Sequence, residues 1–363
     1  MSSIKVAYLI EQCWHRVPGG TAVATLNLAE EMCRLEGIDL VGIAANHKKN
    51  PKKPIPESIE IVNSKLPRQI LYEMWNRFNA PKVENIVKSI DLVHASGGAI
   101  PSTDLPLVAT IHDLSWREQH DWFPARGKRF AETWLVKARK AERIICPSQR
   151  TFKDLVKAGF DEQIIRVVPL GVATRKVCEE QVEGLLEKNS ISTPFVLWVG
   201  TIEPRKNIPT LLQAMQQVPE IPLVLVGPKG WESDLQSAIE PIGERVKIIG
   251  EVDEATKHTW YKAASVFCFP SLMEGFGLPI AEAMSHGTPV VTSSTTATSE
   301  VAGEAALLID PKSADAIAES IKEILGKPEI AKELSKKGLE RAKKMTWENT
   351  ASATADIYRE VVS

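Results

Sequence analysis

The chain of 363 residues lacks several features that mark specialised classes of protein. Its five cysteines are dispersed, odd in number and without a Cys-x-x-Cys pair, which disfavours a disulfide framework and a zinc site. No apolar run approaches the length of a membrane span, and the N-terminal run is too short for a signal peptide. Lys+Arg 44 against Asp+Glu 46 gives a net charge of -2, so no nucleic-acid partner is indicated. We therefore expect a cytoplasmic protein.

Two cofactor signatures are also missing. The Gly-x-Gly-x-x-Gly dinucleotide fingerprint is absent, which disfavours an NAD-dependent oxidoreductase. No Asp-x-Asp motif follows a strand-like run in a convincing place, and no His/Cys cluster has the spacing of metal ligands. The sequence thus predicts neither a cofactor nor a metal site.

Short apolar, β-branched runs alternate along the chain with longer amphipathic segments. Near-continuous apolar strands separated by helices favour parallel sheets covered on both faces. The series covers the chain twice, with a charged break between, and predicts an α/β protein with two doubly wound, Rossmann-like domains. We expect an N-terminal domain over residues 1–172, a linker over 173–193, a C-terminal domain over 194–345 and a final segment over 346–363. The strand-like runs are 4–10, 40–45, 59–62, 92–94, 107–111, 143–146, 165–169, 195–199, 223–226, 246–249, 266–269, 289–292 and 306–309.

The most informative stretch is Ser271-Leu-Met-Glu-Gly-Phe-Gly-Leu-Pro-Ile-Ala-Glu-Ala-Met-Ser-His-Gly-Thr-Pro-Val-Val. It follows the predicted strand 266–269, and Pro279 fits the first turn of a helix. Gly275 and Gly277 then lie in the loop that enters the helix. Glycines let a ligand approach the backbone closely, and the unpaired N–H groups of a first helical turn favour an anion.

Two carboxylates lie on either side of this loop, Glu274 before it and Glu282 on the helix. They would repel an anion, but carboxylates accept hydrogen bonds from hydroxyl groups. A ligand that has both phosphate and polyol parts suits such a site, and a nucleotide sugar is one. The alternative is an ordinary strand–loop–helix joint with two solvated acids.

The segment resembles the donor-binding motif of retaining glycosyltransferases in the large glycosyltransferase 4 family, which have the two-domain GT-B fold. Seven residues separate the two glutamates, with Gly-Phe-Gly-Leu-Pro between them. The resemblance implies two Rossmann-like domains facing a central cleft, a final helix that crosses back to the first domain, and transfer without a metal. It also implies that Glu274 binds hydroxyls of the donor sugar, that Glu282 binds the ribose diol, and that the loop backbone at Gly275, Phe276, Gly277 and Leu278 contacts the donor.

A second segment, Gly200-Thr-Ile-Glu-Pro-Arg-Lys-Asn, follows the predicted strand 195–199. Arg205 and Lys206 could neutralise a diphosphate, Arg as a planar fork and Lys as a point charge. The segment resembles the diphosphate clamp of the same family. A bare Arg-Lys pair is otherwise a solvated surface feature.

Two segments of the first half also resemble parts of family members. Gly19 and Gly20 lie before the first predicted helix, where the resemblance implies contact with donor phosphate or acceptor. His112 and Asp113 follow the predicted strand 107–111, where the family has a His that contacts the donor hexose across the cleft. The catalytic candidates are therefore His112, Glu274, Arg205 and Lys206. The plainer alternatives are a turn for the glycines and a structural role for His112.

The resemblance implies a retaining hexosyltransferase that moves a sugar from a nucleoside diphosphate to an acceptor hydroxyl on a glycan, a lipid-linked or a small-molecule acceptor. GDP-mannose is the first expectation for the donor, followed by UDP-glucose and UDP-N-acetylglucosamine. A GT-B epimerase or hydrolase and a non-catalytic nucleotide-sugar binding protein stay open. Residues 126–143 carry seven basic and two acidic residues, so the sequence leaves open peripheral contact with the inner face of a membrane. The sequence does not indicate an oligomeric state.

Overall fold

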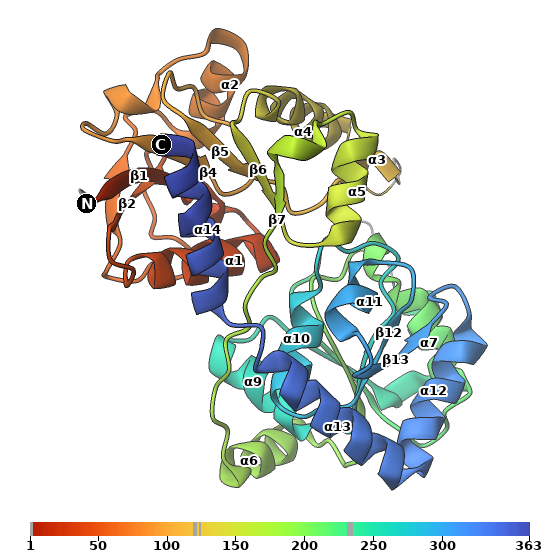
Figure 1. Cartoon of the computed structure of the whole chain (residues 1–363). Coiled ribbons are helices and arrows are strands. Elements are labelled where there is room, and N and C mark those ends of the chain that lie inside the picture. Colours follow the sequence, from red (N-terminus) through yellow and green to blue (C-terminus); the bar gives the residue numbers. More distant parts are fainter. Residues whose placement is uncertain (1–2, 119–121, 123–124, 231–234) are drawn as a thin grey trace. The chain divides into compact units, whose positions relative to one another are not determined.

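The structure, a computed structural model, describes residues 3–118, 122, 125–230 and 235–363 (Figure 1). The chain divides into two compact units of similar size. Unit 1 comprises Met1–Gly171 together with Trp347–Ser363, and unit 2 comprises Val172–Thr346. Each unit is described separately below.

Unit 1 is built on a seven-stranded sheet whose neighbouring strands are all parallel, in the order β3-β2-β1-β4-β5-β6-β7. Most of its strand residues are buried, because helices cover both faces of a doubly wound sheet. The strands are β1 Ile4–Leu9, β2 Ile38–Ala44, β3 Glu60–Asn63, β4 Leu92–Ala95, β5 Leu107–Thr110, β6 Arg143–Cys146 and β7 Ile165–Val167.

Two groups of helices enclose this sheet. One face packs with α2, α4 and α5 into a core that includes Leu9, Trp75, Leu135 and Leu155. On the other face α1 and the C-terminal helix α14 lie side by side (Figure 1). The helices of unit 1 are α1 Gly19–Met32, α2 Arg68–Phe78, α3 Ser115–Glu118, α4 Ala125–Ala138, α5 Gln149–Lys157 and α14 Trp347–Val362.

Unit 2 repeats the plan with a six-stranded parallel sheet in the order β10-β9-β8-β11-β12-β13. The predicted fold class, two doubly wound parallel sheets, is thereby confirmed. The elements of unit 2 are β8 Val196–Val199, β9 Leu223–Val226, β10 Val246–Gly250, β11 Val266–Phe269, β12 Val290–Ser293, β13 Ala306–Ile309, α6 Glu179–Asn189, α7 Ile208–Gln216, α8 Gln236–Ile239, α9 Glu254–Ala263, α10 Leu278–Ser285, α11 Ala297–Ala302, α12 Ala314–Gly326 and α13 Pro328–Ala342.

The segment 173–193, which the charge pattern assigned to a linker, contains the helix α6. This helix packs against α9 and is part of unit 2. Its residues are partly or fully exposed, which explains its low content of large apolar side chains.

Each sheet has one place where the strand order reverses direction. This switch point lies between β1 and β4 in unit 1 and between β8 and β11 in unit 2. Ligands of doubly wound folds bind beyond the carboxyl ends of the strands at such a point. A ligand-binding site in unit 2 is therefore expected at the loops after β8 and β11.

Candidate functional site

The loops after β8 and β11 contain three of the predicted site residues. Arg205 and Lys206 lie in a short 3-10 helix, Pro204–Lys206, that follows β8. Glu274 lies between β11 and α10. The Leu272 N–H donates to the Arg205 carbonyl oxygen at 2.8 Å, which joins the two loops at the switch point.

The three side chains form one buried ion cluster. The Lys206 Nζ lies 2.5 Å from Glu274 Oε1, and the Arg205 Nη1 lies 3.1 Å from Glu274 Oε2. The Arg205 Nε also lies 2.6 Å from Glu203 Oε1. Lys206 and Glu274 are each only 6% exposed. Two cations and two carboxylates thus balance one another inside the unit.

Burial and the neighbouring charges shift the pKa of Glu274 in opposite directions. Burial raises the pKa of its carboxyl group, but the charges of Lys206 and Arg205 outweigh burial, so this pKa lies below its ordinary value. Burial and the charge of Arg205 lower the pKa of the Lys206 ammonium, against the pull of Glu274. Glu274 is therefore a hydrogen-bond acceptor rather than a proton donor at neutral pH.

The N-terminus of α10 begins directly after this cluster. Gly277 is its N-cap and has a φ of +103°, and a Cβ there would lie 2.9 Å from Thr298 Cγ2. Only glycine fits this backbone and this space. Gly275, Phe276 and Leu278 are also buried. The positive end of a helix and two cations therefore lie next to each other, an arrangement that can hold a phosphate group.

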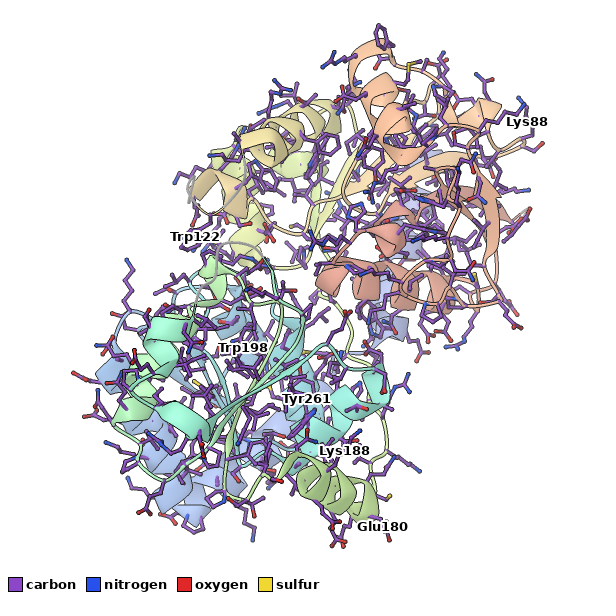
Figure 2. The ribbon with its side chains drawn as sticks, turned by 180° about the vertical axis from the view of Figure 1, so that it is seen from behind. Lys88, Trp122, Glu180, Lys188, Trp198 and Tyr261 are labelled. Atoms are coloured by element: carbon purple, nitrogen blue, oxygen red, sulfur yellow. The ribbon has the colours of Figure 1, made fainter. Side chains whose placement is uncertain are left out.

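Glu282 belongs to a second cluster, between α10 and α9. Its Oε1 accepts from Lys257 Nζ at 2.8 Å, and its Oε2 accepts from the Tyr261 hydroxyl at 2.8 Å. Tyr261, labelled in Figure 2, is fully buried inside unit 2, and its ring contacts Phe267 of β11. Burial and the charge of Glu282 hold the pKa of Tyr261 well above its ordinary value, so its hydroxyl stays a donor.

The same cluster contains atoms of the kind that bind metal ions. In the described part of the chain, Glu254, His258 and Glu282 place one ligand atom each within 4.8 Å of one another. The ammonium of Lys257 lies 2.9 Å from Glu254 and 2.8 Å from Glu282. This ammonium neutralises both carboxylates, so the cluster carries its own cation.

Unit 1 holds the remaining predicted residues. Gly19, with a φ of +60°, and Gly20 are the first residues of α1. The His112 Nε2 lies 3.1 Å from the Ser96 carbonyl oxygen, beyond the ends of β4 and β5. Burial lowers the pKa of His112, against the opposing effects of Ser96 and Asp113, which favours the neutral imidazole.

Asp113 also takes part in a local turn. Its Oδ1 accepts from the Ser115 N–H at 2.9 Å and from the Ser115 hydroxyl at 2.6 Å, at the start of α3. Asp113 therefore caps the start of α3.

The structure brings Arg205, Lys206 and Glu274 together, and places Glu282 in the neighbouring cluster. Sequence reasoning missed Glu203, Lys257 and Tyr261. Glu203 was in the quoted segment, two residues before Arg205, and a partly buried Arg is stabilised by a carboxylate partner. Lys257 and Tyr261 lie on another helix with a spacing of four residues, and a buried Glu282 called for such donors.

Comparison with known proteins agrees with these observations. The family model described as Glycosyltransferase Family 4 matches residues 18–176, and the one described as Glycosyl transferases group 1 matches residues 186–341. The O-antigen chain mannosyltransferase B of Escherichia coli is 34% identical over 265 residues, which cover 69% of this chain and 70% of that protein. The chain belongs to the family 4 glycosyltransferases. The first model falls almost entirely within unit 1 of this glycosyltransferase, and the second within unit 2.

Two further proteins are similar to this glycosyltransferase. The MMP alpha-(1->4)-mannosyltransferase of Mycolicibacterium hassiacum is 28% identical over 291 residues, covering 73% of this chain and 67% of that protein. The solved structure of sucrose-phosphate synthase from Thermosynechococcus elongatus has a TM-score of 0.80 at 23% identity, over 98% of both chains. The shared architecture is the GT-B fold. In the described part of this glycosyltransferase, no helix combines the length and the apolar composition needed to cross a bilayer.

Proposed function

We propose that this glycosyltransferase moves a hexose, with mannose from GDP-mannose as the first candidate, to a hydroxyl of a carbohydrate or lipid-linked acceptor, with retention at the anomeric carbon. The names of two similar proteins, both mannosyltransferases, favour mannose. UDP-glucose and UDP-N-acetylglucosamine are the next candidates for the donor.

The observation that carries this proposal is the ion cluster at the β8/β11 switch point. Arg205 and Lys206 bind the diphosphate, together with the N–H groups at the start of α10. Glu274 accepts hydrogen bonds from hydroxyls of the donor sugar. Glu282 accepts from the ribose diol. Glu203 and Glu274 hold the two cations in place.

In unit 1, His112 is proposed to contact the donor hexose, and the backbone of Gly19 and Gly20 to contact donor phosphate or acceptor. A neutral, buried imidazole suits a hydrogen bond to a sugar hydroxyl and stabilises positive charge that develops on the sugar ring.

The proposed reaction is a front-face displacement. The acceptor oxygen bonds to the anomeric carbon as the bond from that carbon to the phosphate oxygen breaks, and the departing phosphate takes the acceptor proton. Glu274, ionised and paired with two cations, is poorly suited to act as nucleophile or base. Arg205, Lys206 and the α10 N-terminus stabilise the departing charge, which is the task that a metal ion performs elsewhere. The proposed transfer therefore needs no metal.

The test is a transfer assay with GDP-mannose labelled in the sugar, with and without EDTA, over a panel of glycan and lipid-linked acceptors. Label should appear in an α-linked product, at the same rate in EDTA. The configuration at the anomeric carbon is read from the one-bond C1–H1 coupling in NMR. Release of free sugar without an acceptor would indicate a hydrolase, and an altered sugar nucleotide an epimerase. Binding of donor with no turnover over the panel would indicate a binding protein.

Peripheral membrane contact is proposed through the exposed ends of α2 and α4. Phe78, at the end of α2, is 67% exposed, and Val136 on α4 is 60% exposed. Lys137 Nζ donates to the Trp75 carbonyl oxygen at 2.5 Å, which joins the two helices there. Apolar side chains beside basic ones suit an anionic bilayer surface. Replacing Phe78 by Ser should weaken sedimentation with vesicles of phosphatidylglycerol, and unchanged sedimentation would contradict this surface.

A further inference from the structure

Unit 1 carries a concentration of positive charge beyond the carboxyl ends of β1, β2 and β3. The loops 10–18, 45–59 and 64–68 follow these strands. Together they contain seven Lys and Arg residues against two acids, whereas the whole chain carries 44 basic and 46 acidic residues. The basic residues, which we call the basic cluster, are Arg16, Lys48, Lys49, Lys52, Lys53, Lys65 and Arg68.

Backbone and side-chain contacts hold the three loops together. The Lys52 ammonium donates to the Arg16 carbonyl oxygen at 2.6 Å, and Trp14 Nε1 donates to the Lys49 carbonyl oxygen at 3.0 Å. Trp14 also stacks on His47, with ring centroids 4.7 Å apart. The Asn46 N–H donates to the Leu66 carbonyl oxygen at 2.9 Å. The cations therefore belong to one local structure and not to separate solvated loops.

The acids nearby neutralise only part of this charge. Glu11 is fully buried, and its carboxylate accepts from the Ala45 N–H at 2.7 Å and contacts His47. Arg68 Nε lies 4.0 Å from it. Among the described residues, Arg16, Lys48 and Lys49 are exposed and have no carboxylate partner. The cluster thus presents uncompensated cations to solvent.

A buried hydroxyl adds an independent sign of a ligand. The Tyr72 hydroxyl is buried and has no hydrogen-bond partner in the described structure. An added Cβ on Gly98, which follows β4, would lie 3.9 Å from this hydroxyl and 3.8 Å from His15 Cε1. Burial, with a smaller effect of Arg68, lowers the pKa of His15 to about 4. Arg68 also acts electrostatically on the Tyr72 hydroxyl, so both groups lie near this member of the basic cluster. A buried polar atom without a hydrogen-bond partner is uncommon, and it suggests that a ligand supplies the partner.

We infer that the basic cluster and the Tyr72 hydroxyl bind a phosphate group carried by the acceptor. The inference rests on the proposed function, in which the donor occupies the switch point of unit 2 and leaves that of unit 1 for the second substrate. Lys and Arg side chains bind phosphate through charge-assisted hydrogen bonds, and a phenol donates one more. The phosphate belongs to a soluble sugar phosphate or to a lipid headgroup, which share this chemistry.

The test compares the full chain with the double variant Lys48→Gln/Lys49→Gln. The matched control is Lys332→Gln/Lys336→Gln on α13, which removes two exposed charges from unit 2. Binding of inorganic phosphate is measured by ³¹P NMR, and binding of vesicles with and without phosphatidylglycerol by sedimentation. The double variant should bind phosphate or anionic vesicles roughly tenfold more weakly, the control should not change, and Lys48→Arg/Lys49→Arg should restore binding.

The two arms identify the source of the phosphate. Loss of free phosphate binding indicates a soluble acceptor, and loss confined to anionic vesicles indicates a lipid headgroup. The inference is overturned if both probes bind the double variant as they bind the wild type, or if phosphate binding depends only on Lys206. Nucleotide binding, measured on the same double variant, should be unchanged, so failure of this inference is distinct from failure of the donor site.

Discussion

At the scale of single residues, the buried Lys206–Glu274 ion pair is the centre of the proposed donor site. A buried ion pair contributes little net stability, but removing one partner leaves a buried charge and is costly. Such a pair in the loops of a switch point is better explained by a role in ligand binding than by a contribution to stability. We propose that each partner keeps the other ionised and in place for a ligand.

We expect Glu274→Ala and Lys206→Ala each to lower turnover by on the order of a hundredfold or more, because each removes a proposed contact to the donor in the transition state. The measurement is initial-rate transfer on variants whose melting shows that they are folded. Glu183→Ala, at an exposed position on α6, is the control and should leave the rate unchanged. Near-normal rates in both site variants would remove the assignment.

The hydroxyl of Tyr261 should matter for donor affinity. Tyr261→Phe keeps the buried ring but removes the hydrogen-bond donor to Glu282 Oε2. Glu282 is then less well positioned for its proposed contact with the ribose. Nucleotide binding should weaken roughly tenfold, the scale of one hydrogen bond to a charged group. Calorimetric titration measures it. Tyr358→Phe removes a buried hydroxyl from unit 1 and is the matched control. Equal affinities in the two variants would argue against a positioning role for Tyr261.

At the scale of elements, the entry into α10 should tolerate no side chain at position 277. Gly277→Ala places a Cβ 2.9 Å from Thr298 Cγ2 on a backbone with φ +103°. We expect a loss of about 1–3 kcal/mol in the free energy of unfolding and a loss of nucleotide binding. Gly326→Ala, at the end of α12 with open space around it, is the control and should be neutral or slightly stabilising. Urea unfolding measures the free energy of unfolding of both variants. Equal values would contradict the expected backbone strain at position 277.

The sequence was sufficient to predict the elements that carry the site. Apolar runs such as 266–269 and 223–226 coincide with β11 and β9, because a strand buried on both faces must be apolar throughout. Pro279 lies in the first turn of α10, as its chemistry requires.

Contacts between side chains far apart in the sequence could not be predicted in the same way. Lys257 and Tyr261 reach Glu282 from another helix, 25 and 21 residues away in sequence. Local periodicity carries no information on such contacts. Likewise, the charged composition of 173–193 gave no sign of the helix α6, which packs against α9.

At the scale of the molecule, the C-terminal helix α14 is tied into unit 1 by a buried polar chain. His94 Nδ1 lies 2.6 Å from the Tyr358 hydroxyl, and His94 Nε2 lies 2.8 Å from Thr110 Oγ1. Burial, with a smaller effect of His112, lowers the pKa of His94 to about 3. The folded chain therefore needs a neutral imidazole at this position.

This histidine makes stability depend on pH. In the unfolded chain His94 binds a proton near pH 6.5, and in the folded chain only near pH 3, so stability is lost as the pH falls through this window. Between pH 7 and 5 the loss should be about 2 kcal/mol from His94 alone. His15 acts in the same direction. Urea unfolding at both pH values should show a smaller pH effect in His94→Asn, and an unchanged effect would contradict the assignment.

In the proposed donor site of unit 2, this glycosyltransferase binds a nucleoside diphosphate between Lys206, Arg205 and the start of α10. The most direct measurement is the melting temperature with GDP, UDP and ADP, in EDTA, for the wild type and Lys206→Ala. A ligand at a hundred times its Kd adds about 2.7 kcal/mol to the stability of the state that binds it. One nucleotide, GDP first, should raise the melting temperature of the wild type in EDTA and not that of the variant. No shift with any nucleotide, or an equal shift in folded Lys206→Ala, would contradict it.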